Sequence, residues 1–481
     1  MSATGFEEEN SENNEKLLEQ KYLTWKKYIK SSDSLNDIEV PYGEELNPDL
    51  LEKLVLYCLD NNYLDDAAVF CKTWIELAPY SSDPYLRLGI TCLTQGKIDE
   101  AGELVERVLA LNPSDIEGLI YKSLILSLSG EHEEALEVIN YAEILDPESS
   151  DILYHKGLIY EAMSDYASAI DWFERTVSKG VLLKESYIEM AYCHHSLYNY
   201  ERSEQYYEKA IDEDPFDYDQ WYNRGIVCQQ SNKYKEAIEY FDMALAIKDD
   251  FFLALHNRAN AHGVLGKYGD AIDDYQEALK LRPNDIETIH CLSGLYADTG
   301  DYEKAIEGFT NVSELHPSHY EAYFGRAVCH DALEQYEEAL ADFDKSLEFF
   351  DGNPDAWYAK ADLLNNIGKA DEALICYQKS LALNSNNAEC LYDYARVLYD
   401  MNNHAEAETV FLKLIELSPE WSEGYYSLAK IYAENKSFDK AVKFLKRTFL
   451  IDPAKKNIFL REFPEIIGEN ELSHYKTAIL Q

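Results

Sequence analysis

The chain has 481 residues, of which 46% are apolar and 28% charged, and its 90 acidic and 43 basic residues give a net charge of -47. Such a composition is typical of a folded protein with a sizeable core. The charge argues against chain-wide binding to nucleic acid or to an anionic membrane, because both present negative phosphate groups. We therefore expect no nucleic-acid partner.

Two further features indicate the compartment. The nine cysteines include no C-x-x-C pair, and their odd number leaves at least one thiol outside any internal disulfide, which favours a reducing environment. The most apolar stretch, GLIYKSLILSL, is short and is interrupted by Lys122, so no membrane span is expected. These features predict a cytoplasmic protein.

The amino-terminal region comes before the regular part of the chain. Residues 1–14 are acidic and polar, and they predict a disordered tail. Residues 15–47 predict an amphipathic helix followed by a linker. The apolar residues of this helix are Leu17, Leu18, Trp25, Tyr28 and Ile29. The helix would cap the array that follows, or it would occupy the groove of that array or bind a partner.

A period of 34 residues dominates the rest of the chain. Steps of 34 from Ala237 always meet alanine or serine, and steps from Gly225 meet small residues with Val55 as the exception. Steps from Phe241 meet mostly large apolar residues. A fixed period of this length predicts a solenoid. The twelve predicted repeats span 48–81, 82–115, 116–149, 150–183, 184–217, 218–251, 252–285, 286–319, 320–353, 354–387, 388–421 and 422–455.

Each repeat is predicted to form two helices. Trp221, Gly225 and Cys228 recur at helical spacing, and Ala237 with Phe241 lies on a second apolar stripe. A glycine or asparagine recurs between the stripes, where a left-handed residue would end the first helix. Proline closes most repeats, so that one helix ends and another begins.

This pattern of small, aromatic and proline residues resembles the tetratricopeptide repeat family, with its W-x2-L-G-x2-Y, A-x3-F-x2-A and closing Pro. The resemblance covers residues 48–455 without an insertion. It implies an all-α, right-handed superhelical solenoid of antiparallel helix pairs. It also implies that the first helix of each repeat lines a concave groove that binds peptides or protein segments. Residues 456–481 are predicted to form capping helices at the carboxyl end.

The candidate binding surface is formed by positions 2, 5, 6 and 9 of each repeat, counted from Pro48 as position 1 of the first. Position 2 is acidic in eleven of the twelve repeats, and position 5 is often aromatic. Both choices also have a structural explanation, since an acid stabilises the first turn of a helix and the family often has tyrosine here. A ladder of carboxylates would nevertheless favour a basic partner, and the rings would offer contact area.

Asparagines beside the rings of repeats six and seven place the expected centre of binding there. The candidate groove residues are Asp151, Tyr154, Glu185, Asp219, Tyr222, Asn223, His256, Asn257, Asn260, Glu287, His290, Glu321, Phe324, Asp355, Tyr358, Glu389, Tyr392, Glu423 and Tyr426. A metal site at His256 and His290 is the less favoured interpretation of those two residues.

One segment near the carboxyl end reverses the charge of the chain. A secondary basic patch is predicted at Lys436, Lys440, Lys443, Lys446 and Arg447. It would be either solvated helix surface or a docking site for an acidic partner, including weak self-association with another copy.

Motifs for catalysis and for cofactors are missing: there is no G-x-x-x-x-G-K-[ST], G-x-G-x-x-G, H-E-x-x-H or G-x-S-x-G. We therefore expect no enzyme activity, no cofactor and no metal. The sequence predicts a scaffold whose acidic, tyrosine-rich groove binds a basic protein segment. The alternative is a regulatory or adaptor subunit that docks an enzyme or nucleic-acid complex through its basic carboxyl end.

Overall fold

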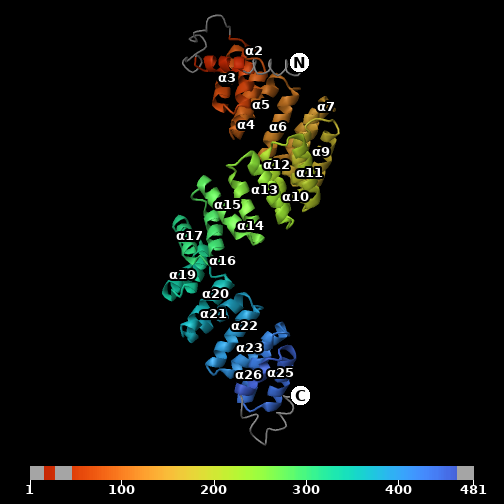
Figure 1. Cartoon of the computed structure of the whole chain (residues 1–481). Helices are drawn as coiled ribbons and strands as arrows, with labels where there is room; N and C mark the ends of the chain where they lie inside the picture. The colour runs from red at the N-terminus through yellow and green to blue at the C-terminus, as the bar shows by residue number, and fades with distance from the viewer. Residues whose placement is uncertain (1–15, 28–45, 463–481) are drawn as a thin grey trace, which may run out of the picture. The chain divides into compact units, whose positions relative to one another are not determined.

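The computed structural model describes residues 16–27 and 46–462, and all regular structure in this part of the chain is helical (Figure 1). The predicted acidic tail, most of the linker and the last part of the predicted carboxyl-terminal cap lie outside the described residues, as do Tyr28 and Ile29. The chain divides into two units, Met1–Asp249 and Asp250–Gln481.

The first unit contains the helical segment 16–27 and the helices α2 (Pro48–Asp60), α3 (Leu64–Leu77), α4 (Asp83–Thr94), α5 (Ile98–Leu111), α6 (Ile116–Leu128), α7 (His132–Leu145), α8 (Ser150–Ala162), α9 (Tyr166–Val177), α10 (Leu183–Ser196), α11 (Tyr200–Glu213), α12 (Tyr218–Gln230) and α13 (Tyr234–Ile247). The second unit contains α14 (Phe252–Val264), α15 (Tyr268–Leu281), α16 (Ile286–Asp298), α17 (Tyr302–Leu315), α18 (Tyr320–Ala332), α19 (Tyr336–Phe349), α20 (Pro354–Asn366), α21 (Ala370–Leu383), α22 (Ala388–Asp400), α23 (His404–Leu417), α24 (Ser422–Glu434), α25 (Phe438–Ile451) and α26 (Lys455–Glu462).

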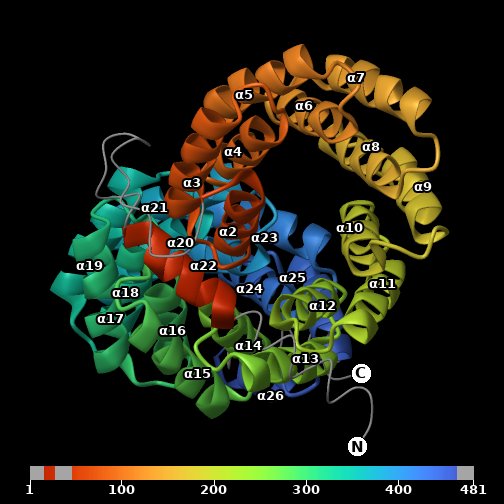
Figure 2. The ribbon, with the colours of Figure 1, turned by 90° about the horizontal axis from the view of Figure 1, so that it is seen from above.

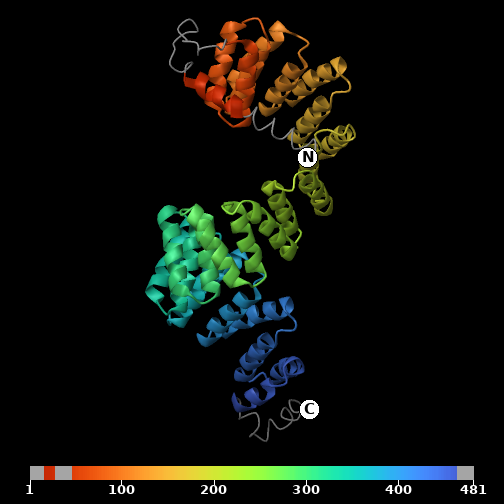
Figure 3. The same cartoon turned by 45° about the horizontal axis from the view of Figure 1, so that its top comes forward.

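Consecutive helices pack as pairs, and the pairs follow one another in chain order along each unit (Figure 3). The predicted all-α solenoid is therefore confirmed. Within the first unit, α4, α6 and α8 line the inner side of the curve and α5, α7 and α9 its outer side (Figure 2). Within the second unit, α16 and α18 likewise lie inside α17 and α19 (Figure 2). The first helix of a pair thus faces inward in both units.

The small and large positions of the period fit together inside each helix pair. Gly225 lies so close to Phe241 of the next helix that an added Cβ would be 2.5 Å from the ring. Gly157 and Phe173 have the same relation, at 2.4 Å. Both rings are fully buried. The glycine at position 8 therefore makes room for the ring at position 24, as the spacing in the sequence suggests.

The turn inside each helix pair uses one left-handed residue at position 15. All twelve repeats have a positive φ there, from Asn62 (58°) to Lys436 (56°). Glycine or asparagine occupies most of these positions, as predicted, because neither is strongly disfavoured in that conformation. Ser164, Tyr198, Glu334 and Lys436 adopt it as well, so the packing of the pair imposes the turn even where the residue disfavours it.

Polar caps start many of the first helices. The Asp115 carboxylate accepts a hydrogen bond from the Gly118 amide at 2.9 Å, and Asp285 does the same for Thr288 at 3.0 Å. Asn387 accepts one from Cys390 at 3.0 Å. Each cap satisfies an amide that has no partner inside the helix, which fixes where the helix begins.

The helical segment 16–27 covers the first helix pair. Trp25 is fully buried, and Tyr22 is 3% exposed and stacks on Tyr63 with ring centroids 5.3 Å apart. The Tyr22 hydroxyl donates to Asp66 at 2.6 Å, and the Lys26 ammonium lies 2.7 Å from the same carboxylate. The segment thus shields the apolar face that the first repeat would otherwise expose.

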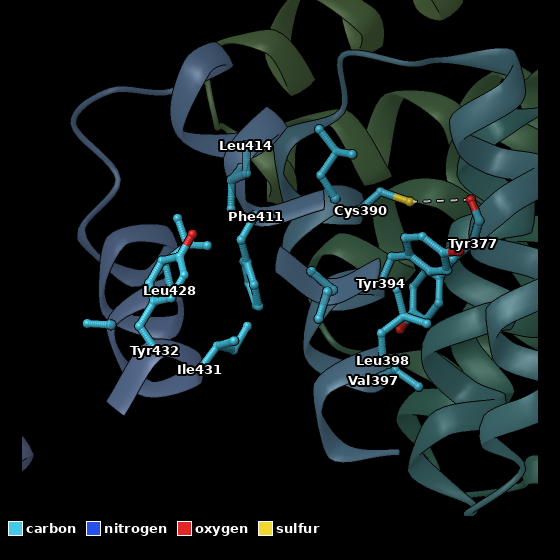
Figure 4. Packing of buried hydrophobic residues seen from close by; sticks show 14 of the residues in the cluster. Tyr377, Cys390, Tyr394, Val397, Leu398, Phe411, Leu414, Leu428, Ile431 and Tyr432 are labelled. Atoms are coloured by element: carbon cyan, nitrogen blue, oxygen red, sulfur yellow. Dashed lines mark hydrogen bonds between the residues drawn. The ribbon is translucent and has the colours of Figure 1, made fainter. Parts of the chain in front are cut away.

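The core of the last repeats is continuous across several helices of the second unit. Tyr377, Tyr394, Phe411 and Tyr432 come from four different helices and belong to one buried cluster (Figure 4). The Cys390 thiol lies in this cluster and contacts the Tyr377 carbonyl at 3.9 Å. Apolar side chains therefore join neighbouring repeats into one packed body, as expected for a solenoid.

Candidate functional site

The acids at position 2 lie in the first turn of the first helices. Six of the eight candidates are exposed, namely Asp151, Glu185, Asp219, Glu287, Asp355 and Glu389. Glu423 is paired with Lys455 at 3.1 Å, and Glu321 lies 3.4 Å from the His319 ring nitrogen Nδ1. The exposed acids stabilise the first turn of their helices through the helix dipole. They also attract a positively charged molecule that approaches the first-helix face.

The rings at position 5 pack against other rings of the protein, so only part of their surface is left for a ligand. Seven of the eight candidate rings contact the ring at position 24 of their own repeat. The centroid distances are 5.5 Å for Tyr154–Phe173, 5.8 Å for Tyr222–Phe241, 5.6 Å for His256–Tyr275, 5.4 Å for His290–Phe309, and 6.1 Å for Phe324–Phe343, Tyr358–Tyr377 and Tyr392–Phe411. Tyr426 instead contacts Phe459 of α26 at 6.2 Å.

One ring departs from the expectation that all would be partly exposed. His256 is buried, at 8% exposure, and its Nδ1 lies 2.9 Å from the Thr288 hydroxyl of the next repeat. Burial lowers the pKa of this imidazole and so favours its neutral form. His256 therefore joins two repeats rather than lining the surface, and the other rings are half-buried.

The three candidate asparagines fall on both sides of the unit boundary. The Asn223 amide in the first unit donates to Gln220 at 3.5 Å. In the second unit, the Asn257 amide donates to the Leu253 carbonyl at 2.9 Å, and the Asn260 oxygen accepts from the Tyr275 hydroxyl. All three amide groups thus have internal partners, which leaves them less available to an extended ligand than their positions suggest.

Tyrosine hydroxyls connect neighbouring first helices through acids that the sequence did not single out. Tyr154 donates to Glu189 of the next repeat at 3.2 Å, and Tyr358 donates to Asp393 at 2.8 Å. Both bonds run from position 5 to position 6 of the following repeat. Glu189 and Asp393 were missed because an acid at position 6 occurs in these two repeats only, so no repeated pattern indicates them.

Glu161 and Glu189 form a carboxyl pair between α8 and α10. The two groups share a hydrogen bond, and the Cys193 thiol lies 3.8 Å from Glu161. Burial, together with the negative charge of Glu189, raises the pKa of Glu161 to about 8. Burial also raises the pKa of Glu189. At neutral pH the pair therefore holds one proton, which Glu161 carries and Glu189 accepts.

This proton predicts a pH-dependent difference between the wild type and Glu161→Gln. The folded wild type keeps a proton that the unfolded chain releases above the ordinary pKa of 4.5, so its stability falls as the pH rises toward about 8. Glutamine does not titrate. We expect Glu161→Gln to gain about 1 to 2 kcal/mol over the wild type between pH 5 and pH 8, because partial solvation reduces the full effect of the shift.

Urea unfolding at pH 5, 7 and 8, followed by circular dichroism, measures this difference. Glu201→Gln on α11 is the control, because Glu201 is exposed and lies outside the pair. It should follow the wild type at every pH. If Glu161→Gln also followed the wild type, the carboxyl pair would hold no extra proton.

The predicted basic patch lies on and just before α25. Lys440, Lys443 and Lys446 are exposed. Lys440 lies 4.8 Å from the Tyr432 ring centroid, and Arg447 is 2.9 Å from Glu420. Lys440 is thus held against its own repeat and Arg447 against the preceding one, and the exposed lysines form the outer face of the patch.

No group of three or more His, Cys, Asp or Glu residues that could hold a metal ion occurs within residues 16–27 and 46–462. The same ranges contain no helix long and apolar enough to cross a membrane. His290 and His319 do lie close together, with ring centroids 5.1 Å apart, and burial lowers the pKa of His290.

Sequence profiles of known families match most of the repeats. Tetratricopeptide repeat profiles match residues 184–217, 218–251, 252–285, 295–354 and 392–449. A profile described as anaphase-promoting complex, cyclosome, subunit 3 matches residues 94–176 and 343–414. No curated protein matches the chain.

Several solved structures are similar to parts of this chain. YrrB, described as a TPR protein with an unusual peptide-binding site, has 24% identity over 37% of this chain and 92% of its own, with a TM-score of 0.35. The APC/C hetero-tetramer Cut9–Hcn1 has 12% identity over 91% of this chain and 97% of its own, with a TM-score of 0.40. Yeast Tom70 has 15% identity over 90% of this chain and 96% of its own, with a TM-score of 0.38.

The helix pairs, their inward-facing first helices and the polar groups along them define a helical-repeat scaffold for protein–protein interaction. The chain belongs to the tetratricopeptide repeat family.

Proposed function

We propose that this chain is a non-enzymatic scaffold that binds a basic protein segment along its inward-facing first helices. The observation that carries the proposal is the row of exposed carboxylates at position 2, such as Asp151, Glu185 and Asp219 in three consecutive repeats. Carboxylates on adjacent helices lie roughly 8 to 10 Å apart, about one Debye length, so their potentials add. A basic segment that follows the face meets an attractive potential at each repeat.

We expect the acids at position 2, more than the rings at position 5, to contact the partner. Since most rings at position 5 are half-buried, they offer only part of their surface to a partner. The exposed acids at position 2 and the polar groups of the first helices would then supply most of the recognition. Charged contacts of this kind favour fast, salt-sensitive binding.

A second candidate function is an adaptor that docks an acidic partner, or another copy, through α25. Lys440, Lys443 and Lys446 are exposed on this helix, and Leu450 beyond them is 73% exposed. A basic helix face with an exposed apolar end can bind an acidic surface. The profile match to a subunit of a multiprotein complex is consistent with such a role.

Neutralising the position 2 acids tests the first candidate. The variant Asp151→Asn, Glu185→Gln, Asp219→Asn keeps side-chain volume and removes three exposed charges. We expect it to lose the protein partners that the wild type retains from a native lysate. The affinity for the main partner should fall roughly 3- to 150-fold, since three exposed pairs contribute about 0.2 to 1 kcal/mol each. Mass spectrometry identifies the partners, and titration measures the affinity.

The matched control is Asp99→Asn, Glu133→Gln, Glu201→Gln. These exposed acids lie in the first turn of the second helices α5, α7 and α11, so the change in net charge and in helix-dipole interaction is the same. The control should bind as the wild type does. Partners that survive the first-helix variant but are lost from Lys440→Gln, Lys443→Gln, Lys446→Gln would transfer the function to α25.

A further inference from the structure

An apolar cavity opens between two neighbouring first helices of the first unit. It has a volume of about 190 Å³ and lies between α6 and α8. Its walls include Leu124 and Leu128 of α6, and His155, Leu158 and Ala162 of α8. Leu124 and Leu158 occupy position 9 of their repeats, which is part of the first-helix face. The cavity therefore belongs to the surface on which we propose that a partner binds.

The shape and lining of the cavity suit one large aliphatic side chain. Leu128 at its edge is 54% exposed, so apolar surface remains open to solvent there. Burial lowers the pKa of His155 and so favours its neutral form, and its ring nitrogen Nδ1 donates a hydrogen bond to the Asp151 carbonyl at 2.8 Å. No charged side chain lines the cavity. A leucine, isoleucine or methionine side chain would lose little hydration of polar groups on entering it.

The carboxyl pair lies one helix further along the same face. Glu161 is on α8. Glu189 is on α10 and accepts a hydrogen bond from the Tyr154 hydroxyl. The other charged groups of α8 and α10 are the exposed acids Asp151 and Glu185 and two lysines that pair with acids of other helices or turns. Lys184 of α10 lies 2.7 Å from Asp214 and 2.8 Å from Asp217. Lys156, the lysine of α8, is buried and is paired with Glu143 of α7. This stretch therefore presents apolar surface at one helix boundary and carboxyl groups at the next.

Building on the proposed function, we infer that the α6–α8 cavity and the Glu161–Glu189 pair together recognise a segment with an aliphatic side chain and, two or three residues away, a lysine or arginine. The spacing follows from geometry. Neighbouring helices lie roughly 8 to 10 Å apart, and an extended chain advances about 3.3 Å per residue. The aliphatic side chain fills the cavity, and the cation takes the place of the shared proton.

The proton gives this recognition a measurable signature. The Glu161 carboxylic acid loses its proton to the buffer when a cation arrives, and both carboxylates then pair with the cation. Binding at neutral pH should release about one proton per segment bound. An apolar contact alone, or a charge contact with the exposed acids alone, would release none.

A random dodecapeptide display library, selected on the full-length chain, tests the inference. Peptides selected by the wild type should share an aliphatic residue and a cation two or three positions apart. Leu158→Asp should weaken the selected peptide roughly 10- to 100-fold, because a carboxylate in the cavity excludes the aliphatic side chain. Glu161→Gln, which keeps the side-chain volume, should weaken it roughly 3- to 10-fold and abolish proton release in calorimetry with buffers of different ionisation enthalpy.

Matched controls lie on second helices, away from the proposed binding surface. Ile144→Asp on α7, where the side chain is 75% exposed, and Glu201→Gln on α11 make the same kinds of change and should leave the affinity of the selected peptide unchanged. Selected peptides that lack the pattern, or that bind Leu158→Asp and Glu161→Gln as tightly as the wild type, would overturn this inference. If those peptides bound the wild type but not the Asp151→Asn, Glu185→Gln, Asp219→Asn variant, the proposed function would stand and only this inference would fail. If the wild type selected no peptide, both the proposed function and this inference would fail.

Discussion

Trp25→Ala is expected to lower the free energy of unfolding by about 3 to 5 kcal/mol, because it removes a fully buried indole. Trp25 belongs to the core cluster that the segment 16–27 shares with the first helix pair. Its loss leaves a cavity over α2 and α3, and water reaches the apolar face of the first repeat. Since each repeat packs mainly on its neighbours, the damage should begin at the amino-terminal end.

Hydrogen exchange resolved by peptide locates the effect of this substitution. Protection should fall first in α2 and α3 and last in the second unit. Leu23→Ala is the matched control, because Leu23 lies on the same segment but is 57% exposed, and its truncation should change stability by no more than about 0.5 kcal/mol. Unchanged protection of α2 and α3 in Trp25→Ala would mean that the segment does not hold the first repeat in place.

Gly225→Ala is the second substitution with a large expected effect. The added Cβ would lie 2.5 Å from a ring carbon of Phe241, and this ring is fully buried. Overpacking of this kind costs about 1 to 3 kcal/mol, which exceeds the gain of up to about 1 kcal/mol from the better helix propensity of alanine. Stability should fall, and α12 and α13 should loosen first.

The same substitution at Gly294 should have the opposite sign. Gly294 lies inside α16, and a Cβ there would meet nothing within 4 Å. Gly294→Ala is therefore expected to raise the free energy of unfolding by about 0.5 to 1 kcal/mol through helix propensity alone. Chemical unfolding of both variants gives the comparison. A loss of stability at both glycines would contradict the explanation by steric overlap with Phe241.

The fold could be predicted from the sequence because its determinants are local and repeated. Small residues at positions 8 and 20 and rings at position 24 can satisfy one another only if two short helices pair closely. The ring at position 24 occurs in eight of the twelve repeats, and Val55 is the one large residue at position 8. The left-handed turn residue is equally local. Asn232 and Gly266 indicate it directly, whereas Tyr198 and Glu334 adopt it under the constraint of the same helix pair.

The candidate site could be predicted only in part. The position 2 acids are found by periodicity, because an exposed residue in the first helical turn needs no partner to keep its place. The burial of His256 and the internal bonds of Asn260 depend on which side chains meet across helices, and periodicity carries no information about that.

The sequence by itself determined the repeat, the helix pairs and the acidic character of the first helices, because each depends on residues within one 34-residue unit. The tertiary structure alone decided which groups act together. Glu161 and Glu189 belong to different repeats, and the proton they share exists because packing brings their carboxyl groups into contact away from water. The cavity between α6 and α8 is likewise a property of two neighbouring repeats, since the side chains of neither one alone enclose it.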